Sequence, residues 1–334
     1  LQKGMNILVV GFGSIGQRHL KNLLELYPEN NYFVLKHSDK KDVIQDCKVI
    51  DNATIYGYYD GVEFFRDIDD INLYDIDAAF ICNDSSRHLN VAFQLLERDI
   101  DMFIEKPIDS DANKVVEFIN NLNRKDSIVM IGYQTRFHPV YLKMREIFDS
   151  CKHDVNYMEI KWANYLPSFH VYEDYTKRYA GKKKLGGGVL LTLSHEINIL
   201  NSFFNDCKIA SSLSGSSKKF SIDVEDFVFA LFKCDDIEVN FTLGYSQVFE
   251  ERYIKFQTHN KYVVGDLISN SVKVFDANGT QKEYSFSLKR NELFAKEARY
   301  FFNCIKTREV GLNTVEESLR DMVLINELKS HKKF

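Results

Sequence analysis

The sequence predicts an α/β protein with an amino-terminal Rossmann domain, a doubly wound parallel sheet, and a carboxy-terminal α+β domain with a large, open, mostly antiparallel sheet. Three observations predict this. Apolar strand segments alternate with amphipathic helices in the first part of the chain. The glycine loop Gly11-Phe12-Gly13-Ser14-Ile15-Gly16 follows the first strand segment, and later strand segments follow one another without helices. We therefore place the two domains at 5–132 and 133–334.

Composition is that of an ordinary globular chain with about two domains. The 334 residues are 45% hydrophobic and 27% charged. The net charge of −5 and the mixed order of charges predict no nucleic-acid partner. No apolar run approaches the roughly 20 residues of a membrane span, so no membrane partner is expected. The six cysteines lie far apart without zinc spacing, which predicts reduced core thiols, no metal and a cytoplasmic location.

The first predicted strand, Asn6 to Val10, leads directly into the glycine loop, and Gln17 to Tyr27 is predicted to form an amphipathic helix. In such a loop the first glycine permits a tight turn, the second lets the backbone approach a pyrophosphate, and the third lets helix and strand pack closely. The phosphates would meet the free N–H groups of the helix amino terminus. This order of elements predicts dinucleotide binding.

The second predicted strand, Tyr32 to Leu35, is followed by Lys36, His37 and Ser38. An NAD-specific site normally has an aspartate or glutamate here, about 20 residues past the glycines, to bind the ribose 2′-hydroxyl. The three side chains present are instead hydrogen-bond donors suited to a 2′-phosphate. The sequence thus favours NADP over NAD, with a dual-specificity site and solvated side chains as the alternative.

The segment 39–75 shows no clear elements, and the strand pattern returns at Asp77 to Cys82. Asn83 and Asp84 end that strand. Because the carboxyl ends of parallel strands meet at one edge of the sheet, we expect these residues to line the cofactor crevice. His88 begins the next helix, either contacting a ligand or lying in solvent.

The third polar strand end is Glu105-Lys106-Pro107, which follows the apolar run from Met102. Proline fixes its own φ and keeps the preceding residue extended, so Lys106 is expected at the carboxyl edge, where ligands bind. The alternative is a strand terminus with a solvated Glu105–Lys106 pair. The glycine loop upstream favours the functional interpretation. A helix over Asp111–Asn123 and a strand over Ser127–Gly132 complete the first domain.

Beyond residue 132 the pattern changes to consecutive strands, which predict a mainly antiparallel sheet. One face of such a sheet needs further cover, so a homodimer or homotetramer through the sheet is expected. Strands are predicted over Val155–Ala163, Val224–Phe232, Ile237–Tyr245, Arg252–Thr258 and Val272–Phe275, and helices over Val140–Asp149, Val189–Phe204, Leu288–Lys306 and Val315–Lys332.

Several motifs together resemble the glucose-fructose oxidoreductase, inositol dehydrogenase and MocA (Gfo/Idh/MocA) family. They are Gly11 to His19, Glu105-Lys106-Pro107, Gly132-Tyr133-Gln134 with Arg136-Phe137-His138-Pro139, and Gly186-Gly187-Gly188 leading to His195. The resemblance implies NAD(P) and oxidation or reduction at a carbon of a sugar or cyclitol. Three further segments are similar to a branch linked to bacterial surface-sugar metabolism: Tyr165-Leu166-Pro167, Glu173-Asp174-Tyr175 and Ser194 to Asn198.

By the same resemblance, Lys106 is the catalytic lysine and His195 the histidine on the helix after the glycines. We assign Lys106 to hydrogen-bond the reacting oxygen and His195 to exchange its proton. Family members commonly carry an aspartate where this chain has Thr192, and Asn198 also stands where an aspartate often follows. A threonine cannot act as a carboxylate base, although Thr192 can hydrogen-bond a substrate from the same helix face as His195.

The sequence thus yields two sets of candidate binding residues. The cofactor set is Gly11, Phe12, Gly13, Ser14, Ile15, Gly16, Lys36, His37, Ser38, Cys82, Asn83, Asp84, His88, Glu105, Lys106 and Gln134. The substrate set is Lys106, Arg136, Tyr165, His170, Lys183, Thr192 and His195. Arginine and lysine suit an anionic substrate such as a nucleotide sugar, although the lysine run at 182–184 is equally consistent with a solvated loop. Two alternatives remain open: a cofactor-binding sensor or regulatory protein without turnover, and an enzyme that retains and recycles its NAD.

Overall fold

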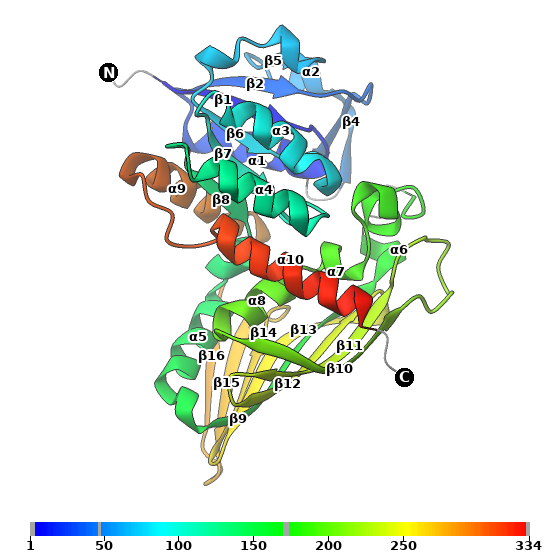
Figure 1. Ribbon diagram of the computed structural model, residues 1–334, viewed down its shortest axis with the longest axis vertical. Helices are drawn as coiled ribbons and strands as arrows, with labels where there is room; N and C mark the ends of the chain where they lie inside the picture. The colour runs from blue at the N-terminus through cyan, green and yellow to red at the C-terminus, as the bar shows by residue number, and fades with distance from the viewer. Residues whose placement is uncertain (1–3, 46–47, 170–173, 332–334) are drawn as a thin grey trace. The chain divides into compact units, whose positions relative to one another are not determined.

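A computed structural model describes residues 4–45, 48–169 and 174–331 of the chain (Figure 1). These residues form two compact units. The first comprises 4–132 and 294–319, and the second comprises 133–169, 174–293 and 320–331. The segment 294–319, which the sequence placed in the second domain, packs with the first unit because Phe294 and Phe301 contribute to its aromatic core.

The first unit contains a six-stranded, all-parallel sheet. Its order is β5 (Glu63–Phe65), β2 (Asn31–Leu35), β1 (Asn6–Val10), β6 (Ala78–Ile81), β7 (Asp101–Glu105) and β8 (Val129–Gly132). The chain moves away from β1 in one direction and from β6 in the other. This is the Rossmann order, with its ligand crevice where the direction reverses.

Helices cover both faces of this sheet, because right-handed connections place them on opposite faces when the strand order reverses. On one face, the His19 ring of α1 (Ser14–Leu26) contacts Phe103 at 5.0 Å and Phe294 of α9 (Arg290–Thr307) at 5.7 Å. On the other, Phe93 of α3 (His88–Leu96) and Phe118 of α4 (Ala112–Leu122) lie 5.3 Å apart. This unit also contains α2 (Ile55–Tyr58) and the hairpin β3 (Asp42–Gln45) with β4 (Lys48–Thr54).

The second unit is built on an eight-stranded sheet, in which β12 and β9 are parallel and all other neighbours antiparallel. Its order is β10 (Cys207–Gly215), β11 (Phe227–Cys234), β12 (Ile237–Gly244), β9 (Val155–Tyr165), β13 (Ser246–Thr258), β14 (Lys261–Asp266), β15 (Ser271–Asp276) and β16 (Gln281–Ser285). The predicted fold class is therefore confirmed, although β10, β14 and β16 were not expected.

One face of this second sheet is buried and the other is open. Along β11, Val228 and Phe232 are fully buried, whereas Phe229 between them is 51% exposed. The helices α5 (Pro139–Cys151) and α8 (His195–Phe203) lie over the buried face (Figure 1). The unit also includes α6 (Leu166–Phe169), α7 (Val189–Thr192) and part of α10 (Val315–Ser330).

The single helix predicted over Val189–Phe204 is wrong, because two helices occupy this segment. The first, α7, ends at Thr192, and Leu193 has φ −97° and ψ 27°, outside the helical region. The second, α8, begins at His195. The break is invisible in the apolar pattern, yet it places His195 in the first turn of a new helix.

The expectation that all cysteines are reduced is also wrong for two of them. Cys207 and Cys234 are directly opposite in the antiparallel register of β10 and β11 and form a disulfide. Cys82 and Cys304 are buried thiols, and Cys151 is partly buried. In the described ranges, no helix is long and apolar enough to cross a membrane.

Candidate cofactor and substrate sites

The glycine loop of the first unit has the shape of a phosphate cradle. Gly11 has φ +85°, and a Cβ atom there would lie 2.6 Å from the backbone of Asn83. A Cβ atom on Gly13 would meet no atom within 4 Å, so the space in front of this residue is open. Gly13 is also the N-cap of α1 and supplies no side-chain acceptor to the first-turn N–H groups. These features fit a dinucleotide pyrophosphate.

The residues that follow β2 lie beside this loop, since the Gly11 N–H donates to the Leu35 carbonyl at 2.9 Å. Lys36 is only 4% exposed and its ammonium donates to the Ser38 carbonyl. Burial, and then the nearby Arg66, lower the pKa of Lys36. His37 and Ser38 are exposed. Of the three predicted phosphate donors, the lysine is therefore the least accessible.

Cys82 and Asn83 border the glycine loop, since a Cβ atom on Gly11 would lie within 3 Å of the backbone of both residues. Burial raises the pKa of the Cys82 thiol well above its ordinary range. His88 is 1% exposed, and its ring nitrogens lie 2.9 Å from the carbonyl oxygens of Pro107 and Asn83. Burial lowers its pKa, against the opposing effect of these carbonyls. The structure thus gives His88 a role in joining the segments after β6 and β7.

The Glu105 side chain points into the first unit. Its Oε1 lies 2.7 Å from His19 Nε2, and its Oε2 accepts the Lys106 backbone N–H at 3.2 Å. Glu105 therefore anchors the strand end that carries Lys106. Nearby Glu297 of α9 is fully buried, and neither of its carboxyl oxygens has a hydrogen-bond partner in the described structure. Burial, and then Glu105, raise the pKa of Glu297 well above its ordinary value.

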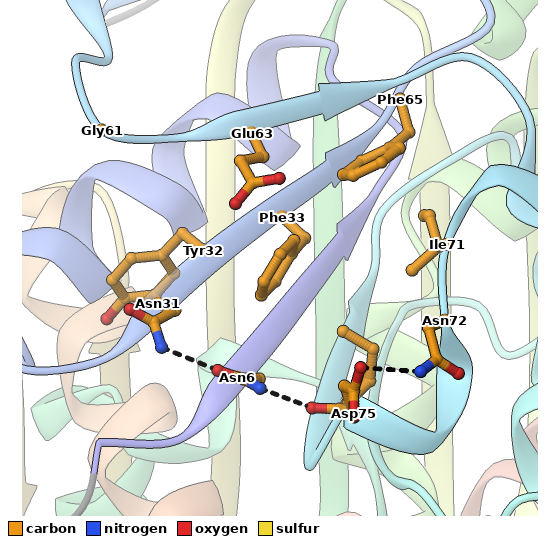
Figure 2. Close-up of a pocket in the computed structure, with 11 residues that line it drawn as sticks. Asn6, Asn31, Tyr32, Phe33, Gly61, Glu63, Phe65, Ile71, Asn72 and Asp75 are labelled. Carbon is orange, nitrogen blue, oxygen red and sulfur yellow. Dashed lines mark hydrogen bonds between the residues drawn. The ribbon is translucent and has the colours of Figure 1, made fainter.

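A cavity of about 400 Å³ lies elsewhere in the first unit, at the amino ends of β1, β2 and β5. Figure 2 shows the side chains of Phe33, Phe65 and Glu63 around it. Several of its amide groups are already paired, as in the bonds from Asn31 to Asn6 and from Asn72 to Asp75 (Figure 2). Ligands of parallel sheets bind at the carboxyl ends, so this cavity is not the cofactor crevice.

The second unit contains a buried polar group around His195. This residue is 3% exposed, and its ring lies 5.7 Å from that of Tyr133 and 6.2 Å from that of Trp162. Thr192, the last residue of α7, is 1% exposed and interacts with Tyr245, whose pKa is raised well above its ordinary range, chiefly by burial. Thr192, His195, Tyr133 and Tyr245 are therefore all buried side chains of the second unit.

Asn164 is a residue that the sequence reasoning missed. It is 5% exposed, and neither atom of its side-chain amide has a hydrogen-bond partner within the described ranges. It lies two residues beyond Trp162 on β9 and so on the same face of the sheet. A buried amide without partners requires an explanation, and a bound ligand is one. Asn164 was not predicted because the expected strand ended at Ala163, whereas β9 continues to Tyr165.

Two arginines donate hydrogen bonds to side chains of α8 that are close to His195 in the sequence. Arg252 Nε donates to Glu196 at 2.6 Å, and its guanidinium lies 3.8 Å from the Trp162 ring centre. Arg136 Nη1 donates to Asn198 at 3.4 Å. Asn198, which stands at a frequent aspartate position of the family, donates in turn to a buried carboxylate, that of Asp321, at 2.9 Å. The Asp321 carboxylate also accepts from Asn201 at 2.8 Å, so it holds two asparagines of α8.

The other predicted substrate residues are less enclosed. Tyr165 is 37% exposed, with its ring 6.1 Å from that of Phe220. Lys183 is exposed, and its backbone N–H donates to Asp223 at 2.7 Å. Gln134, expected at the cofactor, belongs to the second unit. His170 lies outside the described residues.

A pair of glycine substitutions tests the cradle. Gly13→Ala should leave the free energy of unfolding within about 1 kcal/mol, because its Cβ meets no protein atom. The same Cβ fills the space proposed for phosphate, so dinucleotide affinity should fall at least about tenfold. Gly11→Ala should instead unfold the protein more readily, because of its φ of +85° and the clash with Asn83. Calorimetric titration and thermal melts measure both effects. Unchanged affinity in Gly13→Ala would exclude this loop as the phosphate site.

Comparison with known proteins agrees with this geometry. Residues 5–133 match the model of an oxidoreductase family with an NAD-binding Rossmann fold, Gfo/Idh/MocA. Inositol 2-dehydrogenase of Rhizobium meliloti is 32% identical over 75 residues, which cover 22% of this chain and 23% of that protein. The chain aligns with between 23% and 54% of the length of its curated relatives.

Solved structures with the same fold cover nearly the whole chain. A levoglucosan dehydrogenase in complex with NADH and L-sorbose has a TM-score of 0.82 at 11% identity, covering 98% of this chain and 96% of that one. A 3-ketoreductase from Actinomadura kijaniata, in complex with TDP-benzene and NADP, has a TM-score of 0.76 at 14% identity and covers 98% of both chains. With the glycine loop and the Rossmann strand order, these findings confirm the predicted resemblance: residues 5–133 match the Gfo/Idh/MocA oxidoreductase family, and the chain as a whole shares its fold with solved sugar dehydrogenases and ketoreductases.

Proposed function

We propose that this protein is an NAD(P)-dependent oxidoreductase that transfers a hydride to or from a hydroxyl-bearing carbon of a sugar, sugar derivative or nucleotide sugar. The observation that carries the proposal is Lys106, which directly follows β7 at the carboxyl edge of a family-matched Rossmann sheet. A bound nicotinamide supplies the hydride chemistry, and the protein must orient the substrate and move a proton.

In this proposal Lys106 hydrogen-bonds the reacting oxygen and His195 exchanges its proton, so both must reach one substrate. Thr192 donates or accepts a hydrogen bond rather than acting as a base. Asn164 binds a substrate hydroxyl with its side-chain amide, which has no hydrogen-bond partner among the described residues. Arg136, Tyr165, His170 and Lys183 bind the remainder of the substrate, the cations being most useful if it is anionic.

The cofactor crevice is proposed to accept NADP in preference to NAD. Gly11 to Gly16 would hold the pyrophosphate, with Phe12, Asn83 and Asp84 beside it. No carboxylate occupies the position directly after β2, where Lys36, His37 and Ser38 stand. The positive charge at this end of the crevice is what supports the NADP preference.

We also propose a homodimer or homotetramer formed through the second unit's sheet. Its open face carries large apolar side chains, among them Phe229 at 51% and Leu231 at 40% exposure. Contiguous apolar surface of this kind favours association with a second copy. Sedimentation that shows only monomer at micromolar concentration would contradict the assembly but not the activity.

His195→Asn tests the proton role. We expect kcat to fall by about 10²- to 10⁴-fold, with dinucleotide affinity within about twofold. The pH dependence that a titrating imidazole gives to the rate should also disappear. The matched control is His153→Asn, an exposed histidine of the same unit, which should behave as wild type. A His195→Asn variant with unchanged rate and pH profile would remove His195 from the mechanism.

A further inference from the structure

We propose that Arg66 is the residue that recognises the 2′-phosphate of NADPH, and that Asp39 holds its guanidinium in place until the phosphate binds. The inference rests on the proposed function, because it concerns the cofactor crevice of the same enzyme. It assigns a binding role to a residue that follows β5 rather than β2, where the sequence pattern pointed.

Backbone pairing fixes the position of Arg66. The Gly11 N–H donates to Leu35, the last residue of β2, at 2.9 Å. The next residue, Lys36, donates its N–H to the Phe65 carbonyl at 3.0 Å. Arg66 follows Phe65 directly, at the end of the parallel neighbour strand. The glycine loop, the end of β2 and Arg66 therefore lie in sequence along one sheet edge, where the adenosine ribose of a dinucleotide binds.

The side chains at this edge form a cationic site around one carboxylate. Arg66 Nη1 lies 2.5 Å from Asp39 Oδ1, and their side chains are 57% and 88% exposed. Arg66 lowers the pKa of Asp39, burial opposes it, and Lys36 and Lys41 lower that pKa further. The charges of three cations thus act on this single carboxylate, so positive charge is in excess here and stabilises a phosphate.

Accessibility distinguishes Arg66 from Lys36. The lysine is 4% exposed and already donates to the Ser38 carbonyl, so it contributes charge rather than a direct contact. The arginine is exposed, always charged, and has the planar fork that binds phosphate oxygens in pairs. An incoming 2′-phosphate would replace the Asp39 carboxylate on that fork.

Asp39 supports an opposite reading, in which its carboxylate accepts a hydrogen bond from the ribose 2′-hydroxyl and so favours NADH. Its pairing with Arg66 opposes this, because the guanidinium already occupies the carboxylate. The two readings predict opposite effects for Asp39→Asn. Removing the charge should strengthen phosphate binding if Arg66 is the reader, and weaken binding of the unphosphorylated nucleotide if Asp39 is.

The test uses calorimetric titration of the whole chain with 2′,5′-ADP, the adenosine half of NADPH, and with 5′-AMP, its counterpart from NADH, which lacks only the 2′-phosphate. Wild type should bind 2′,5′-ADP more tightly than 5′-AMP. Arg66→Ala should weaken 2′,5′-ADP by about 10- to 100-fold, the worth of charge-assisted hydrogen bonds, and change 5′-AMP by less than about twofold. Asp39→Asn should tighten 2′,5′-ADP by a few-fold and leave 5′-AMP unchanged.

Two controls keep the result specific. Arg124→Ala removes an exposed arginine located between α4 and β8, and should change neither titration. Arg66→Lys keeps the charge without the planar fork, and should fall between wild type and Arg66→Ala. Equal affinity of the wild type for both nucleotides, equal weakening of both by Arg66→Ala, or selective loss of 5′-AMP binding in Asp39→Asn would each overturn the inference. Since no turnover is measured, failure of the proposed oxidoreductase activity would leave these results unaffected.

Discussion

Replacing Lys106 with methionine should lower kcat by at least about a hundredfold while leaving dinucleotide affinity nearly unchanged. Methionine keeps the length of the side chain but cannot donate a hydrogen bond or a proton to the reacting oxygen. The fold should survive, because the strand end is held by Glu105, which accepts the residue 106 backbone N–H. Steady-state kinetics and a thermal melt measure the two properties separately.

Lys125→Met is the matched control, because Lys125 is an exposed lysine of the same unit. This variant should retain wild-type kcat. A Lys106→Met variant that turns over at the wild-type rate would contradict the proposed mechanism. Loss of cofactor binding as large as the loss of rate would instead make Lys106 a binding residue.

Glu297→Gln should make the protein more resistant to rising pH. Glu297 is fully buried near Glu105 and Cys82, and its carboxyl oxygens have no hydrogen-bond partner among the described residues. Burial and Glu105 raise its pKa from the ordinary 4.5, so the folded chain retains a proton that the unfolded chain releases. Stability is therefore lost as pH rises between the two pKa values, by about 1.4 kcal/mol per pH unit for one proton.

Glutamine carries no such proton, so the difference in unfolding free energy between the variant and wild type should grow by about 1.4 kcal/mol per pH unit above pH ~5. Urea unfolding at several pH values measures this slope. Glu292→Gln, an exposed position on the same helix, should run parallel to wild type. A parallel profile for Glu297→Gln as well would show that Glu297 is ionised or paired in the folded protein.

The Rossmann unit was largely predictable, because its information is local. The run Asn6 to Val10 forms β1 as predicted, and the glycines after it form the turn into α1. In this segment the spacing of apolar residues, the turn-forming glycines and the burial pattern all indicate the same elements. Segment 39–75 showed no clear pattern, because its strands are short: β3 and β4 pair with each other in a hairpin, and β5 pairs with β2, which lies earlier in the chain.

The candidate site was less predictable, because its parts depend on tertiary contacts. The apolar pattern of Val189–Phe204 is continuous, so it concealed the break before His195. The disulfide between Cys207 and Cys234 depends on a strand register that spacing does not reveal. Arg66, Asn164 and Glu297 belong to no motif, and only burial and partners distinguish them.

The measurement that tests the central claim most directly is the absorbance of the reduced nicotinamide. In one direction the protein is mixed with NADPH or NADH and a panel of keto-sugars. In the other it is mixed with the oxidised cofactor and a panel of sugars, cyclitols and nucleotide sugars. The proposed function predicts that at least one compound changes the cofactor's redox state, and that Lys106→Met abolishes the change. If a dinucleotide binds but no compound ever alters it, the oxidoreductase account is contradicted. A cofactor-binding sensor without turnover would then explain why Thr192 stands where an aspartate is common in the family. Nicotinamide that survives purification would instead indicate an enzyme that retains and recycles its cofactor.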